Sequence, residues 1–174
     1  LPLVIIGILS GFVASLYMRG LTGYLPIPKK IPQVLLPVLA GIICGIVGLF
    51  VPEVLGLGSE TIQSLLLNER SIDYLLILLI VKLFLTVICI RFNLFGGIFS
   101  PALFIGASLG CVLAIVFQLI LPFSNSSLFA VAGMAAVTGC VIGGPISAMM
   151  IIFELTSDYQ VALGAGISIC FANI

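Results

Sequence analysis

The sequence of 174 residues contains no histidine and very few charged side chains. Only 7% of its residues are charged, whereas an average soluble domain is about 25% charged. Six basic and six acidic residues cancel, so the chain lacks the basic character by which proteins bind nucleic acid. At the same time 62% of the residues are hydrophobic and the mean hydropathy is +1.44. Water is therefore the wrong solvent for this chain, and nucleic acid is not an expected partner.

The cysteines do not form a metal-binding pattern. Histidine is absent, and the cysteines are scattered singly through apolar segments without a C-x-x-C pair, so the usual zinc ligand sets are missing. We predict that they are small buried hydrophobic residues rather than disulfides or metal ligands. They are Cys44, Cys89, Cys111, Cys140 and Cys170. No metal or other cofactor is expected.

Long apolar segments predict an all-α, polytopic membrane protein, because a helix needs about 20 apolar residues to cross a bilayer. The proline-rich stretch 20–32 is expected to be a loop, and a short helix over 60–67 is too short to span. Asp158 is expected to cap the last helix. The predicted longer helices cover residues 1–18, 33–51, 73–90, 101–121, 128–142, 146–155 and 159–174.

Small residues recur four positions apart on three of these helices. The pairs are Gly7 and Gly11, Gly41 and Gly45, and Gly106 and Gly110. Such rows let another helix approach closely. The simplest interpretation is packing within the chain, and a contact between subunits is the alternative for the first pair.

One stretch interrupts two long apolar segments with residues that break helices. Residues 93–101 read Asn-Leu-Phe-Gly-Gly-Ile-Phe-Ser-Pro. Pro101 suits the first turn of a helix, where its missing N–H costs nothing. Gly96 and Gly97 are expected to let the backbone adopt conformations closed to other residues just before that turn.

A helix that starts here would expose peptide amides. The N–H groups of Ile98, Phe99 and Ser100 would precede the first helical hydrogen bond. Lipid offers them no acceptor, so they should be buried in protein or face a cavity. A small anion is a suitable occupant, because the N–H groups and the helix dipole both favour negative charge.

At these residues the chain resembles the CLC family of chloride channels and chloride/proton antiporters, whose second-half anion motif reads GxFxP. Here the motif is Gly97-Ile98-Phe99-Ser100-Pro101. The likeness continues in the same order through residues 102–110, 132–136, 144–145 and 153–160. The resemblance implies an inverted-repeat membrane architecture with broken and non-spanning helices. It also implies transport of chloride or a similar small anion, without covalent chemistry, so the protein is not expected to be an enzyme.

The resemblance assigns roles to the motif. Gly97 would permit the turn, Ile98 and Phe99 would contribute amides, the Phe99 ring would wall the pathway, and Pro101 would fix the helix start. The gating and proton-path glutamates and the central tyrosine of the family have no counterpart in this chain, so channel and antiporter both stay open. A membrane scaffold, or another secondary transporter with a broken helix, is the alternative function.

The resemblance also predicts the setting. The chain begins and ends inside apolar segments, so we expect residues 1–174 to be part of one transmembrane CLC domain, truncated at both ends and without a soluble domain. Its expected partners are chloride, the lipid bilayer and a second copy, with a homodimer formed through segments 1–18 and 146–172. The expected location is a bacterial inner membrane.

Lys82 lies near the middle of an apolar segment. A charged group at bilayer depth costs at least ~2.5–3.5 kcal/mol, so this side chain should face the protein interior or a wet cavity. It could raise the local anion concentration along a pathway. The alternative is a structural lysine that pairs with a carboxylate such as Glu154 or extends to the membrane surface.

Overall fold

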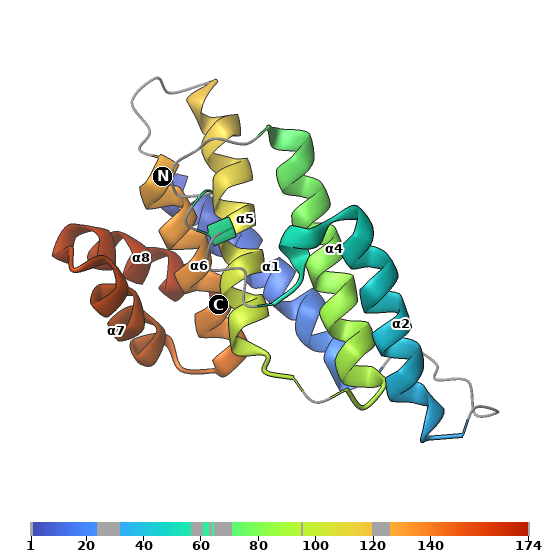
Figure 1. Cartoon of the computed structure of the whole chain (residues 1–174). Coiled ribbons are helices and arrows are strands. Elements are labelled where there is room, and N and C mark those ends of the chain that lie inside the picture. The colour runs from blue at the N-terminus through green and yellow to red at the C-terminus, as the bar shows by residue number, and fades with distance from the viewer. Residues whose placement is uncertain are drawn as a thin grey trace.

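The computed structural model of the chain describes residues 2–23, 32–56, 61–62, 64, 71–94, 96–119 and 126–173. Within these ranges the secondary structure is helical, without a strand, which confirms the all-α prediction (Figure 1). The predicted loop 20–32 and the predicted short helix 60–67 lie largely outside the described residues. The elements are α1 (Pro2–Thr22), α2 (Leu35–Phe50), η1 (Pro52–Val54), α4 (Ile72–Arg91), α5 (Phe99–Gln118), α6 (Ser126–Ile142), α7 (Pro145–Thr156) and α8 (Tyr159–Ala172).

Three of these helices are long and apolar enough to cross a membrane. They are α1, α4 and α5, each of 20 or 21 residues, while α2, α6, α7 and α8 are shorter apolar helices. The longer helices predicted from the sequence are all present, with ends that differ by a few residues. Helix α1 runs to Thr22, past the predicted end at residue 18, and stops at Gly23, whose φ is +124°. Helix α5 begins at Phe99 rather than Pro101, because proline fits any position of a first turn.

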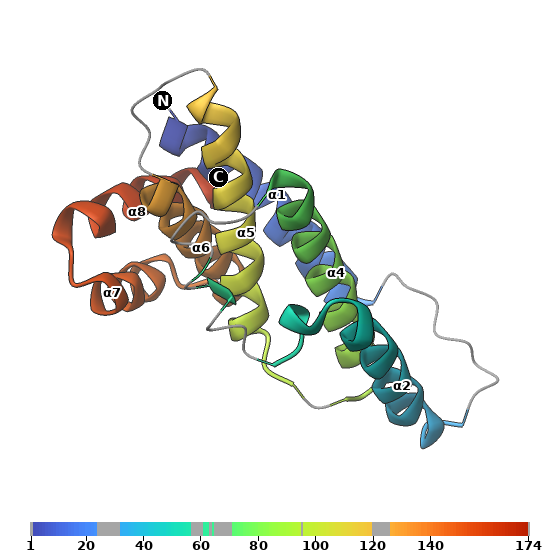
Figure 2. The ribbon, with the colours of Figure 1, turned by 45° about the horizontal axis from the view of Figure 1, so that its top comes forward.

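Helices α5 and α6 pack backbone to backbone in the middle of the molecule (Figure 2). A Cβ atom added to Gly106 would lie 2.5 Å from the Gly133 carbonyl oxygen of α6, and one added to Gly110 would meet the Phe129 carbonyl. Side chains are therefore excluded from this contact. Helix α6 is buried along most of its length, which its alanines and glycines make possible. The third glycine pair thus packs within the chain, as predicted.

Helix α1 packs against α8 through the first glycine pair. A Cβ atom on Gly7 would lie 2.5 Å from the Ser168 carbonyl oxygen, and one on Gly11 would lie 2.5 Å from the Ala172 carbonyl oxygen. The Ser168 hydroxyl donates to the Leu3 carbonyl oxygen over 2.9 Å, which ties the same two helices. The interpretation of this pair as packing within the chain is confirmed.

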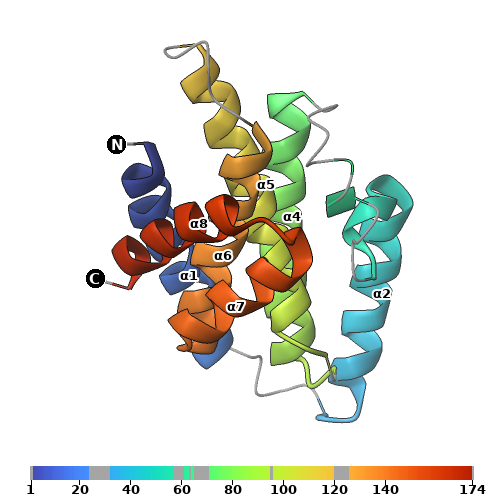
Figure 3. The ribbon, with the colours of Figure 1, turned by 90° about the vertical axis from the view of Figure 1, so that its left-hand side faces the viewer.

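Helix α2 lies at the edge of the bundle (Figure 3). Among the described residues its main contacts are with α4 and η1. The pair Gly41 and Gly45 has no atom within 4 Å of an added Cβ, so the described chain offers no partner for this row. The prediction of a packing face there is not met among the described residues, where α2 packs through Ile43, Cys44 and Val47 instead.

The start of α8 follows the local sequence signal. The Asp158 carboxylate accepts hydrogen bonds from the backbone N–H of Gln160 over 2.8 Å and of Val161 over 3.4 Å. The predicted cap is therefore confirmed. It lets α7 and α8 form a hairpin that packs on α6.

The close contact of α5 and α6 predicts a strong effect of one added methyl group. Gly106→Ala should lower the free energy of unfolding by about 1–3 kcal/mol, because a Cβ atom would overlap the α6 backbone. Gly45→Ala is the matched control, and it should leave stability unchanged or raise it by about 0.5–1 kcal/mol. Unfolding in detergent with increasing SDS would measure both. Equal behaviour of the two variants would contradict the backbone contact.

Candidate functional site

Helix α4 ends in a Schellman motif directly before the predicted break. The Leu94 N–H donates to the Cys89 carbonyl over 2.9 Å, and the Asn93 N–H donates to the Ile90 carbonyl over 3.1 Å. Asn93 has φ +58°, a left-handed conformation that asparagine adopts more readily than most residues. The last carbonyls of α4 are thus satisfied within the chain, and the backbone leaves the helix at a defined point.

The predicted interruption between α4 and α5 is present, but its glycines act differently from the prediction. Neither Gly96 nor Gly97 has a positive φ, so neither uses a conformation closed to other residues. Among the described residues between α4 and α5, Asn93 is the one in a left-handed conformation. Both glycines are exposed, and no atom of the described residues lies within 4 Å of an added Cβ. Their effect is to leave the peptide backbone uncovered, so that a ligand can approach it closely.

Helix α5 starts immediately after these glycines. Its first helical hydrogen bond runs from the Ala102 N–H to the Ile98 carbonyl over 3.2 Å. The amides of Ile98 and Phe99 precede this bond, so the helix itself supplies no acceptor for them. Ile98, the residue before the helix, makes no side-chain cap. The positive end of the α5 dipole therefore lies at Phe99 and Ser100.

A cavity of about 470 Å³ lies beside the start of α5. It brings together Gly97, Ser100 and Pro101 of the predicted site with Lys82 of α4. Ile98 and Phe99 are not among its lining residues, and Phe99 is 36% exposed. The remaining lining residues belong to three parts of the chain: α2, η1 with the turn after it, and α4 with the segment that follows it. They are Cys44, Val54, Leu55, Gly56, Leu85, Thr86, Cys89, Ile90, Leu94 and Gly96.

Lys82 is buried, with 4% of its surface exposed. Its ammonium donates to the Val54 carbonyl oxygen over 2.6 Å and to the Gly56 carbonyl oxygen over 3.0 Å, and it lies 5.0 Å from the centroid of the Phe104 ring. The prediction that it pairs with Glu154 or extends to the surface is wrong, because Glu154 is exposed on α7 and the acceptors are neutral carbonyls.

The surroundings of Lys82 hold an ammonium ion without cancelling its charge. Two carbonyl oxygens and an aromatic face provide partial negative charge, and an ammonium has a third N–H donor. A charge in a poorly hydrated site acts more strongly on its neighbours than the same charge in water. The cavity beside Gly97 and Ser100 is therefore electropositive, with one full charge and the start of one helix.

Sequence reasoning missed the wall that holds Lys82. This wall is the turn around Val54 and Gly56, where Gly56 has φ +66°. Only the high glycine content of residues 56–58 marks it in the sequence. The turn lies 26 and 28 positions from Lys82 in the chain, so no local pattern joins them.

The cysteine prediction is partly wrong. None of the five forms a disulfide, as predicted, and Cys111 is buried. Cys170 is exposed, however, and Cys44, Cys89 and Cys140 are only half-buried. A thiol is small and apolar enough for either position, so composition alone does not decide its burial.

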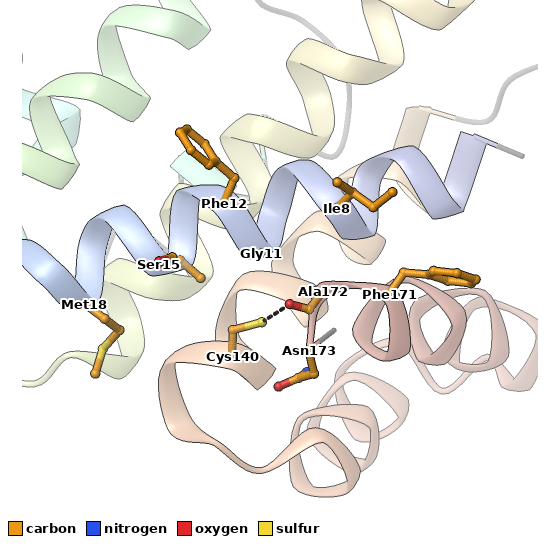
Figure 4. Close-up of a pocket in the computed structure, with 10 residues that line it drawn as sticks. Ile8, Gly11, Phe12, Ser15, Met18, Cys140, Phe171, Ala172 and Asn173 are labelled. Carbon is orange, nitrogen blue, oxygen red and sulfur yellow. Dashed lines mark hydrogen bonds between the residues drawn. The ribbon is translucent and has the colours of Figure 1, made fainter.

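A second cavity, of about 540 Å³, lies between α1 and the end of α8 (Figure 4). The Cys140 thiol donates to the Ala172 carbonyl oxygen over 3.2 Å (Figure 4), and the lining residues include the apolar Ile8 and Met18. Among its lining residues in the described chain there is no charged side chain. It is therefore a poorer candidate for an anion than the cavity at Lys82.

Comparison with known proteins supports one family. The sequence model described as "Voltage gated chloride channel" matches residues 1–174. The chain is 36% identical over 149 residues to "Chloride channel protein CLC-e" of Arabidopsis thaliana. This match covers 76% of this chain and 21% of that protein. It is 31% identical over 125 residues to the "H(+)/Cl(-) exchange transporter ClcA" of Salmonella arizonae, covering 71% of this chain and 26% of that protein.

A solved structure has the same fold. The crystal structure of a slow cyanobacterial Cl−/H+ antiporter superposes with a TM-score of 0.84 at 28% sequence identity, and the match covers 98% of this chain and 41% of that one. The chain thus spans about a quarter of the two relatives and less than half of the solved structure. The overall fold is therefore shared with that structure.

The bonds of Lys82 predict a structural cost for its removal. Lys82→Met should lower the free energy of unfolding by about 1–3 kcal/mol, because the Val54 and Gly56 carbonyls lose their donor. Arg19→Met is the control, since Arg19 is exposed on α1, and it should change stability by less than about 0.5 kcal/mol. Thermal unfolding of the purified protein in detergent measures both. Wild-type stability of Lys82→Met would contradict the carbonyl contacts.

Proposed function

The chain belongs to the voltage-gated chloride channel (CLC) family, and from this premise we propose that it forms part of the anion pathway of a protein that carries chloride or a similar small anion across a membrane. The observation that carries the proposal is the cavity where Gly97 and Ser100 at the start of α5 meet the buried Lys82. The printed names of the Arabidopsis and Salmonella relatives, a chloride channel and a chloride/proton exchanger, support the choice of ion.

In the proposed mechanism the anion binds to the partial positive charges of backbone N–H groups rather than to a charged side chain. From the cavity, which Gly97 and Ser100 line, the anion reaches the amides of Ile98 and Phe99 between these two residues and exchanges water for them, where the helix dipole favours its charge. Gly97 leaves room for it to reach the backbone, and Pro101 keeps the first turn in place. Lys82 acts at longer range by raising the anion concentration in the cavity. Binding of this kind is weak enough for the anion to leave again.

The proposed transport does not depend on which of the two family mechanisms applies. A channel and a proton-coupled exchanger both bind the anion and release it on the other side of the membrane. Residues 97–101 and Lys82 would act in anion binding, which both mechanisms share. The proposed function is therefore anion transport by a complete protein to which residues 1–174 contribute.

For the setting we propose a homodimer in a bacterial inner membrane, formed through segments 1–18 and 146–172. Large apolar side chains on these segments are exposed in the single chain, among them Phe12 at 70%, Ile146 at 78% and Leu155 at 64%. Such a surface needs lipid or another subunit to cover it. The Salmonella and cyanobacterial relatives favour a bacterial membrane, and the plant relative makes a plant membrane the alternative.

The second candidate function is a membrane scaffold built on glycine rows. The observation in its favour is the unpartnered row of Gly41 and Gly45 on α2. The row of Gly7 and Gly11, by contrast, is already occupied by α8, so it does not offer a free assembly surface. Anion transport is the better supported of the two.

A bulky side chain at the cavity should block transport without unfolding the protein. Gly97→Leu is expected to remove most chloride flux from liposomes that contain the full-length protein, because the side chain would occupy the approach to the α5 amides. Stability should be kept, since no atom lies within 4 Å of an added Cβ. Gly41→Leu is the control, in equally open space on α2 but outside the cavity, and should leave flux unchanged. Full flux from Gly97→Leu would favour the scaffold.

The charge of Lys82 should matter most when chloride is scarce. Lys82→Gln is expected to raise the chloride concentration that gives half-maximal flux, because the cavity then attracts fewer anions. Lys82→Arg keeps the charge and should retain most of the wild-type value. Flux measured over a series of chloride concentrations separates this effect from unfolding, which lowers flux at every concentration. A half-maximal concentration that does not change in Lys82→Gln would contradict a role of the charge.

A further inference from the structure

Two of the five cysteines lie side by side at the cavity. The Cys44 and Cys89 sulfur atoms are 3.0 Å apart, although the residues are 45 positions apart in the chain. Cys44 comes from α2 and Cys89 from the last turn of α4. Both line the cavity that contains Lys82 and Gly97, and both are half-buried rather than enclosed. The proposed anion pathway does not use either thiol.

We propose that Cys44 and Cys89 are an oxidisable thiol pair, which a peroxide converts to a disulfide that regulates the cavity. The first thiol loses its proton, and the resulting thiolate attacks one oxygen atom of hydrogen peroxide, so that the O–O bond breaks and a sulfenic acid forms. The hydroxide that leaves takes up the proton lost by the thiol and becomes the first water molecule. The second thiol attacks this sulfur and displaces a second water molecule, which leaves the S–S bond. Two thiols and one peroxide thus give one disulfide and two water molecules.

The geometry favours a bond within the chain. A disulfide has an S–S distance of about 2.05 Å, so the sulfur atoms have to approach by about 1 Å from their present 3.0 Å. Helix α2 can accommodate such a shift, because among the described residues its main contacts are with α4 and η1 only. Cys111 and Cys140 lack this opportunity, since Cys111 is buried and the Cys140 thiol donates to the Ala172 carbonyl.

The disulfide would add a second connection between α4 and the neighbouring elements that line the cavity. Lys82 already joins α4 to the turn after η1 through the Val54 and Gly56 carbonyls. A bond between Cys44 and Cys89 would join α2 itself to α4, so that both α2 and the turn after η1, which line the cavity, are fixed to α4. The regulatory part rests on the proposed function: a wall that cannot move admits a hydrated anion less readily, and oxidation lowers flux.

The experiment uses the full-length protein in liposomes, with Cys170→Ser as the background because Cys170 is the exposed thiol. Hydrogen peroxide is added, free thiols are blocked by alkylation, and chloride flux is measured before and after reduction with dithiothreitol. Peptides from a non-reducing digest are identified by mass spectrometry. We expect a peptide pair joined through Cys44 and Cys89, and a loss of most of the flux that dithiothreitol restores.

Single substitutions provide the controls. Cys44→Ser and Cys89→Ser should each keep their flux in peroxide and give no joined peptide, whereas Cys111→Ser should behave like the background. If Cys44 and Cys89 stay free in peroxide, the thiol pair is refuted. If they join and flux is unchanged, the regulatory role is refuted. A protein that joins them but shows no chloride flux even when reduced refutes the proposed transport and leaves the thiol pair standing.

Discussion

Backbone amides without a helical partner are the constraint on which this structure depends. In an apolar environment no water accepts a hydrogen bond from these N–H groups. A helix can therefore start there only where protein or a ligand provides the acceptors. In the segment between α4 and α5, the backbone groups at the end of α4 and those at the start of α5 are treated differently. The carbonyls at the end of α4 are satisfied within the turn by Asn93 and Leu94. The amides at the start of α5 receive no acceptor from their helix and lie next to a cavity, which makes this point suited to a ligand.

The position of that start is set by packing rather than by the break itself. Gly106 of α5 lies against the backbone of α6, and α6 is surrounded by other helices over most of its length. The first turn of α5 therefore belongs to a rigid central pair. Lys82, which lines the same cavity, ties α4 to the turn around Val54 and Gly56. A helix start fixed by packing thus shares the cavity with a turn that depends on a few contacts.

This difference between the two sides gives the site its chemical character. The rigid side offers dipoles, which attract an anion without holding it permanently. The other side offers one ammonium ion with neutral acceptors and two adjacent thiols. A permanent charge attracts anions at a distance, and a thiol pair responds to oxidants. Both line the 470 Å³ cavity that the start of α5 also lines.

Local patterns in the sequence were sufficient for the helices, the break before Pro101 and the Asp158 cap, because hydropathy, proline and capping act over a few neighbouring residues. The motif likewise pointed to the family. Tertiary structure alone decided that Lys82 bonds to carbonyls rather than to Glu154, that Cys44 meets Cys89, and that Gly41 meets nothing in the described chain. These outcomes depend on which residues from distant parts of the chain come together. Side-chain chemistry permits several partners, and only the packing of α2, α4 and η1 selects among them.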